Sequence, residues 1–321
     1  MMPKQDDKRN AKSVPVGDYF LFALLSLLAV IWISVRLMHL QLDFRSEVVL
    51  SGLAIVAGSF LLTWAAEAAE RDVPQAFALG VLALIIVIPE YAVDMYLAWK
   101  AAVDPAYLHY PTANMTGANR LLIGLGWALI AILYMVRNRK AELKLDSPRN
   151  VELAFLYAAT LYSFVIPIKG TLSLADAVVF LWLFVLYARA LAKSERKESE
   201  LVGPALTLAE MPTAMRRGLV VTFMSLAGVG IFFSAEPFSE GLLTIGQTYN
   251  MSKYLLIQWI APLASEAPEL IIATLLTLKS RPGAAFGALI SSKVNQWTLL
   301  IGMLPLTFNL SALLNNVIVP G

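Results

Sequence analysis

Long apolar stretches separated by short polar segments dominate this chain of 321 residues. A helix needs about 20 mostly apolar residues to cross a hydrocarbon core about 30 Å thick. Because unpaired backbone groups are not tolerated in lipid, each such stretch is predicted to be a transmembrane helix. The stretches cover residues 18–38, 47–69, 76–100, 113–136, 150–168, 172–192, 218–235, 253–279 and 284–310. The pattern predicts an all-α membrane protein with about nine transmembrane helices.

The composition supports a membrane protein and excludes several other classes. Hydrophobic residues make up 58% of the chain and charged residues 15%, whereas a soluble domain is about half apolar and a quarter charged. A net charge of +2 gives no reason to expect a nucleic-acid partner. The chain has no cysteine and two histidines, which excludes thiolate chemistry and disfavours a histidine-rich metal site. No phosphate-binding loop is present, so we expect neither ATP hydrolysis nor an organic cofactor.

The distribution of basic residues predicts the orientation in the membrane. With the N-terminus inside, 18 of the 25 Lys and Arg residues fall in inner segments and 5 in outer ones. Such a bias is typical of cytoplasmic loops, so we expect a cytoplasmic N-terminus in an inner or plasma membrane. The first apolar stretch is longer than the core of a signal peptide, and we interpret it as a retained helix. The remaining basic residues, Arg120 and Lys293, lie inside predicted helices.

Two predicted helices carry a Pro-Glu pair near their middle. The pairs are Pro89-Glu90, in the stretch 76–100, and Pro268-Glu269, in the stretch 253–279. Each is followed by a helix that begins with small and polar residues. Because the two Pro-Glu helices are the third and the eighth of the predicted spans, they run in opposite directions. Inverted repeats with broken helices near the bilayer midplane are a recurring plan of transporters.

The repeats define a domain organisation for the whole chain. The predicted units are a cytoplasmic tail (1–17), an extra transmembrane helix (18–38), a first inverted repeat (47–192), a cytoplasmic linker (193–217) and a second, incomplete repeat (218–321). The linker has room for a short amphipathic helix on the membrane surface. The second repeat holds two helices fewer than the first, which leads us to expect a chain truncated at its C-terminus.

Four carboxylates fall well inside the predicted helices, namely Glu90, Asp94, Glu266 and Glu269. Four such groups left alone would cost on the order of 10 kcal/mol, so they are expected to face a cavity, pair or bind ions. Helical spacing places Glu90 with Asp94, and Glu266 with Glu269, on shared faces. Asp94 lies nearer the outer end of its helix, and for it a structural role is as acceptable as a functional one. Glu67, near the inner surface, is expected to be solvated.

Prolines and amides add further oxygen atoms to this region. A proline inside a helix frees the carbonyl four residues earlier, which points to Ile85 for Pro89 and Ala264 for Pro268. Carboxylates beside free carbonyls suit hard cations such as Ca²⁺ and Na⁺. The following helices supply Asn114, Asn119, Ser291, Ser292, Asn295 and Gln296. For single members of this set, an interhelical hydrogen bond is an equally acceptable explanation.

On these motifs the sequence resembles the cation/calcium exchanger superfamily, including its sodium/calcium exchanger membrane region. That family has two inverted repeats, each with a Gly-Thr-Ser-x-Pro-Glu-like and a Gly-Asn-x-x-Gly-Ser-Asn-like segment. The segments IIVIPE and ASEAPE place Glu90 and Glu269 at the family's glutamate positions. ANMTGAN and GALISSK match the second motif at Asn114, Gly117, Asn119, Gly287 and Ser292. The resemblance implies an antiporter fold that exchanges cations by alternating access.

The sequence also departs from the family pattern. The Thr-Ser before Pro89 is missing, Glu266 stands where a serine is common, and Lys293 takes the position of the motif's last Asn. By depth, Lys293 lies near the middle of the bilayer beside the second Pro-Glu helix, where it needs a partner. It is either a tethered cation in the ion site or half of a structural Lys–Glu pair.

The sequence predicts a secondary active antiporter that exchanges Na⁺, Ca²⁺ or H⁺, and not an enzyme. Its predicted partners are inorganic cations and the lipid bilayer, without a prediction of oligomeric state. The expected ion ligands are Glu90, Glu269, Glu266, Asn114, Asn119, Ser292 and Asn295, with Lys293 as the tethered cation. The rivals are a membrane-embedded lipid enzyme and a non-transporting sensor or structural homologue whose site is closed by Lys293.

Overall fold

A computed structural model describes residues 16–73, 83–139, 142, 150–193 and 201–317. Every regular element in these ranges is a helix. Eight helices in the described ranges are long and apolar enough to cross a membrane. They are Val16–Leu37, Phe44–Ala69, Pro105–Asn138, Asn150–Lys169, Leu174–Lys193, Thr213–Thr248, Lys253–Leu278 and Pro282–Leu314. Each coincides with a predicted stretch, and the all-helical membrane fold is confirmed.

The remaining predicted stretch, 76–100, is broken at its first Pro-Glu pair. Residues 74–82 lie outside the described ranges, a short helix α4 spans Ala83–Ile86, and α5 spans Ile88–Ala101. Val87 separates them with φ −87° and ψ 2°. Pro89 therefore lies in the first turn of α5, where a missing N–H costs no helical hydrogen bond. The break places Glu90 at the start of a helix.

Both polar helices that follow the Pro-Glu helices contain a wider π-helical segment. The first consists of α6 (Tyr110–Asn119), η3 (Arg120–Gly126) and α7 (Trp127–Asn138). The second consists of α14 (Pro282–Asn295), η4 (Gln296–Leu300) and α15 (Ile301–Leu314). Such segments are rare and occur often at functional sites. The hydrophobic pattern does not reveal them.

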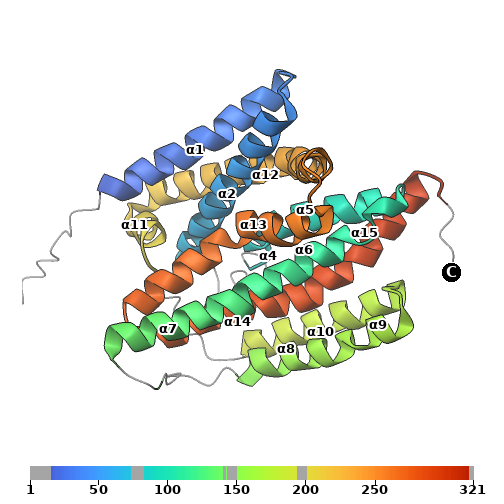
Figure 1. Cartoon of the computed structure of the whole chain (residues 1–321). Coiled ribbons are helices and arrows are strands. Elements are labelled where there is room, and N and C mark those ends of the chain that lie inside the picture. The colour runs from blue at the N-terminus through green and yellow to red at the C-terminus, as the bar shows by residue number, and fades with distance from the viewer. Residues whose placement is uncertain (1–15, 74–82, 140–141, 143–149, 194–200, 318–321) are drawn as a thin grey trace, which may run out of the picture.

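The helices lie in three groups across the bundle (Figure 1). On one side are α1 (Val16–Leu37), α2 (Phe44–Ala69), α11 (Pro204–Glu210) and α12 (Thr213–Thr248). On the other side are α8 (Asn150–Ser163), α9 (Val165–Lys169) and α10 (Leu174–Lys193). Between them lie α5, α13 (Lys253–Leu278) and the two helices with π-helical segments, which run from α6 to α7 and from α14 to α15. The central group thus contains both Pro-Glu helices.

Helix α12 is much longer than the predicted stretch 218–235. It has 36 residues, which corresponds to about 54 Å at ~1.5 Å per residue, and so extends well past a ~30 Å core. Its extension contains Glu240, whose carboxylate accepts hydrogen bonds from Tyr96 at 2.5 Å and Tyr107 at 2.8 Å. In the sequence Glu240 looks like a loop residue because it is charged. In the structure the two phenol groups satisfy its carboxylate, and the helix continues past it.

Helix α11 (Pro204–Glu210) is a short helix in the predicted linker, and it packs against other helices of the chain. Leu208 and Ala209 are buried in one apolar cluster with Leu61 of α2 and Phe223 of α12. Thr207 donates a hydrogen bond to Asp18 of α1. The apolar side of α11 is therefore buried against protein. Residues 194–200 of the linker lie outside the described ranges.

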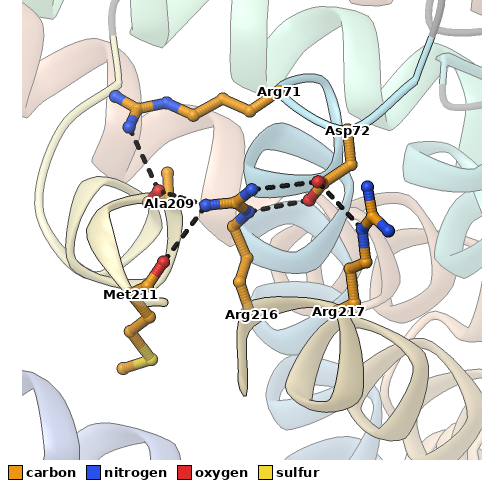
Figure 2. Close-up of polar contacts among 6 residues, drawn as sticks. All are labelled: Arg71, Asp72, Ala209, Met211, Arg216 and Arg217. Atoms are coloured by element: carbon orange, nitrogen blue, oxygen red, sulfur yellow. Dashed lines mark hydrogen bonds and ion pairs between the residues drawn. The ribbon is translucent and has the colours of Figure 1, made fainter. Parts of the chain in front are cut away.

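An ionic junction joins the end of α2 to the beginning of α12 (Figure 2). Arg216 binds Asp72 through two hydrogen bonds of 2.7 and 2.9 Å, and donates to the carbonyls of Ala209 and Met211. Arg217 adds one bond of 3.0 Å to Asp72 and is 63% exposed. The hydrogen bonds from Arg216 and the charges of both arginines lower the pKa of Asp72 to about 2. The junction fixes α2, α11 and α12 to one another.

We predict that Arg216→Gln destabilises the protein more than Arg217→Gln does. Hydrogen bonds to a charged group contribute about 1.5–3 kcal/mol each, whereas an exposed ion pair contributes about 1 kcal/mol or less. Thermal unfolding in detergent at neutral pH would measure both. Because the folded state lowers the pKa of Asp72, its contribution is present above about pH 4 and is lost as the pH falls toward 2. Equal losses for the two variants would contradict this prediction.

Candidate ion-binding site

Charged side chains from both Pro-Glu helices meet in the central group. Glu90 lies in the first turn of α5, Glu266 and Glu269 lie in the middle of α13, and Lys293 lies in the last turn of α14. Glu90 is 3% exposed, and Glu266 and Lys293 are completely buried. Glu90 interacts electrostatically with Glu266, Glu269, Asp94 and Lys293. The helices thus bring one ammonium group among four carboxyl groups.

Hydrogen bonds link the two halves of the chain at this point. Lys293 Nζ donates to Glu266 Oε1 at 2.9 Å and to Gln296 Oε1 at 2.5 Å. The amide nitrogen of Gln296, at the start of η4, lies 3.4 Å from Glu90 Oε2 and 3.4 Å from Glu266 Oε1. Gln296 therefore lies between the acidic residues of α5 and α13, with its oxygen toward the ammonium group.

Asp94 extends the cluster by one turn of α5. Its Oδ1 accepts a hydrogen bond of 3.0 Å from Asn114 Nδ2 on α6, and both side chains are buried. Asp94 also interacts electrostatically with Glu266 and Lys293. This contact connects Asn114 to the carboxylates of the central group.

The region contains several buried oxygen atoms with no hydrogen-bond partner among the described residues. They are Asp94 Oδ2, Asn114 Oδ1, Asn119 Oδ1, Glu266 Oε2, Glu269 Oε2 and Ser292 Oγ. A buried polar atom without a partner is uncommon in a folded protein and needs an explanation. Oxygen atoms of carboxylates and amides are the ligands of hard cations such as Ca²⁺. Each oxygen is of a kind that binds such cations, although among the described residues no three acidic or histidine side chains stand close enough together to hold a metal ion in this structure.

The predicted ligands differ in how closely the structure connects them. Glu90, Glu266, Glu269 and Lys293 come together, and Asn114 joins them through Asp94. The oxygens of Asn119 and Ser292 are buried, but among the described residues no hydrogen bond links them to the glutamates. Asn295 is 8% exposed and precedes Gln296 in the chain.

Two residues interact with the acidic residues of the site more closely than the sequence indicates. Gln296 bridges Glu90 and Glu266, although in the sequence it is only one of six polar residues on the helices that follow the Pro-Glu pairs. Glu67, in the last turn of α2, is partly buried and interacts electrostatically with Glu70 and Glu269, rather than being solvated. Its position near the end of an apolar helix hid this proximity, which depends on how α2 packs against α13.

A close contact between α6 and α13 holds the two halves of the site in register. A Cβ atom on Gly117 would lie 1.8 Å from the backbone oxygen of Gln258. The Gln258 side chain is buried, accepts a hydrogen bond from Arg120 and donates one of 3.2 Å to Thr116. Gly117 is one turn from Asn114 on the same helix. The contact therefore positions Asn114 relative to the acidic residues of α13.

The chain is thus a helical membrane bundle with carboxylates of both Pro-Glu helices in its central group. Residues 47–192 and 219–317 match the model of the sodium/calcium exchanger protein family. The chain belongs to this family, which confirms the family indicated by its motifs.

Individual relatives agree with this assignment. A solved structure of an H⁺/Ca²⁺ exchanger, CAX, is 46% identical, with a TM-score of 0.87 over 93% of this chain and 76% of that chain. The antiporter CaxA of Alkalimonas amylolytica is 24% identical over 75% of each chain. A Ca²⁺/H⁺ antiporter structure, YfkE, at 17% identity and a TM-score of 0.64, shares the fold and covers 91% of this chain and 82% of that chain. These relatives are named as exchangers or antiporters.

We predict that Gly117→Ala disrupts the site, whereas Gly124→Ala does not. The added methyl group at Gly117 would collide with backbone, and overpacking of this kind costs about 1–3 kcal/mol or more. At Gly124, in η3, an added Cβ meets nothing within 4 Å. Thermal unfolding in detergent should show a clear loss for the first variant and little change for the second. Similar melting temperatures for both would show that the α6–α13 contact is not a tight one.

Proposed function

We propose that the chain is a secondary active antiporter that exchanges Ca²⁺ for H⁺ across the membrane. The observation that carries the proposal is the cluster of buried Glu90, Asp94 and Glu266 with half-buried Glu269, in which carboxylate oxygens of Asp94, Glu266 and Glu269 have no partner among the described residues. A buried carboxylate is stable only when a cation or a proton compensates its charge. Departure of Ca²⁺ therefore requires that protons or other cations take its place, which couples the two fluxes.

Glu90 and Glu269 are the central ligands in this proposal. Each directly follows the proline of its Pro-Glu pair, and the two interact with each other electrostatically. Glu266 supplies a further ligand or the proton site, and Asn114, Asn119, Ser292 and Asn295 assist. Access alternates between the two sides of the membrane, with the N-terminus on the cytoplasmic side. Similarity to an H⁺/Ca²⁺ exchanger at 46% identity favours H⁺ over Na⁺ as the counter-ion.

Lys293 alone does not close this site. Its ammonium group is bonded to one carboxylate oxygen, Glu266 Oε1, while Glu266 Oε2 and Glu269 Oε2 have no partner among the described residues. One positive charge is too little to neutralise four carboxylates. The arrangement therefore favours a transporter over a homologue that has lost its ion.

Uptake of radioactive Ca²⁺ into proteoliposomes tests the proposal. Vesicles with a pH gradient, a Na⁺ gradient or neither are compared, with and without an ionophore that removes the gradient. We expect uptake that depends on the pH gradient. Uptake driven only by Na⁺ would assign sodium as the counter-ion, and absence of Ca²⁺ flux under every gradient would refute the proposal.

We predict that Glu90→Gln and Glu269→Gln each reduce Ca²⁺ flux by about tenfold or more. The amide keeps the shape but removes the charge, and one charge-assisted contact contributes about 1.5–3 kcal/mol. The matched control is Glu142→Gln, because Glu142 is exposed and lies in the segment between α7 and α8. The variants should still insert and unfold cooperatively. If either glutamine variant transports like the control, that glutamate is not a ligand.

A further inference from the structure

Lys293 is one of the largest completely buried side chains in the described part of the chain. It lies in the last turn of α14, and the π-helical segment η4 begins three residues later at Gln296. An ammonium group buried in a membrane bundle is costly unless it is paired. Its partners are therefore part of how the centre of this protein is built.

The surroundings of the Lys293 ammonium group are those of a bound cation. Its nitrogen contacts two side-chain oxygens, Glu266 Oε1 at 2.9 Å and Gln296 Oε1 at 2.5 Å. The other end of the Gln296 amide faces Glu90 Oε2 and Glu266 Oε1. Gln296 thus presents its oxygen to the positive charge and its N–H groups to the negative ones.

The pairing uses only part of the available negative charge. Lys293 interacts electrostatically with Glu90, Asp94 and Glu269 as well as Glu266. Asp94 Oδ2, Glu266 Oε2 and Glu269 Oε2 have no hydrogen-bond partner among the described residues. A second cation therefore has oxygens left to bind, but it has to bind beside a positive charge that never leaves.

We propose that the Lys293 ammonium group is a built-in cation that permanently fills one cation position of the ion site. It lowers the affinity of the remaining position for Ca²⁺ by repulsion and limits the site to one transported divalent ion. This inference rests on the proposed Ca²⁺ transport and adds a residue that sets affinity and stoichiometry. A Lys–Glu pair that only holds α13 and α14 together would leave both quantities unchanged.

Equilibrium binding of Ca²⁺ to the purified full chain in detergent tests the inference. Lys293→Met removes the charge, and Lys293→Arg keeps it. We expect Lys293→Met to lower the Kd for Ca²⁺ about tenfold or more, or to add a second bound ion, because like charges at short range repel strongly. Lys293→Arg retains the positive charge and should neither lower the Kd nor add a second bound ion. Unchanged affinity and stoichiometry in Lys293→Met would overturn the inference.

A second pair of variants decides the matter if Lys293→Met does not fold, since that change leaves Glu266 unpaired. Glu266→Gln is compared with the double variant Glu266→Gln/Lys293→Met, in which no partner is left alone. The built-in cation predicts weaker Ca²⁺ binding in Glu266→Gln and recovery to within about threefold of the parent in the double variant. If removal of Lys293 has no effect on Kd in the Glu266→Gln background, the ammonium group is only structural.

The two proposals fail in different ways. If the parent chain binds no Ca²⁺ and transports none, the proposed function is wrong. If the parent binds Ca²⁺ and Glu269→Gln removes that binding, but loss of Lys293 changes neither Kd nor stoichiometry, only the inference about Lys293 is wrong.

Discussion

Uncompensated charge cannot remain in a hydrocarbon environment, and this constraint explains most of what is unusual in the chain. Glu90, Asp94 and Glu266 are buried, and half-buried Glu269 has one buried carboxylate oxygen, so water cannot hydrate these groups freely. The Lys293–Glu266 pair, the Gln296 bridge and the Asp94–Asn114 hydrogen bond all respond to that burial. The helix break at Val87 and the π-helical segment beginning at Gln296 place these groups within reach of one another. The irregular features of the backbone therefore gather where the charges are.

The surrounding helices position this centre and face the lipid. At one end of α12, Arg216 forms an ion pair with Asp72, which follows α2. Toward the other end, Glu240 accepts a hydrogen bond from Tyr96 of α5. Apolar contacts among α1, α2, α11 and α12 form a separate cluster on that side of the bundle. On the outward faces, large apolar side chains such as Phe20, Trp182 and Phe232 are exposed, as expected for surfaces in a bilayer. Polar contacts near the two ends of α12 and apolar packing between the helices therefore stabilise this side of the bundle.

The sequence predicts the membrane spans well because their signal is local. Twenty apolar residues in a row are recognised without knowledge of their neighbours, and the two Pro-Glu pairs mark the buried glutamates. The extension of α12 escaped prediction because Glu240 depends on Tyr96 and Tyr107, which are 144 and 133 residues away.

Distant packing also explains what the sequence missed at the site. Glu67 resembles a solvated helix end because its proximity to Glu269 arises from packing between helices far apart in the chain. The chemical type of each side chain could be read from the sequence. Which residues far away in the sequence it contacts could not. The roles of Asn119, Ser292 and Asn295 stay predictions for the same reason.

The contact at Gly117 has a consequence for how the molecule can move. At this point no side chain separates the backbones of α6 and α13, and there is no layer of flexible groups to absorb sliding. Translation of one helix along the other would drive backbone into backbone, whereas a small rocking about the contact point would not. The contact then acts as a pivot for relative motion of the two helices. In such a rotation, residues near the pivot move least and residues at the helix ends move most. Asn114, one turn away, therefore keeps nearly the same distance from α13 while the helix ends move.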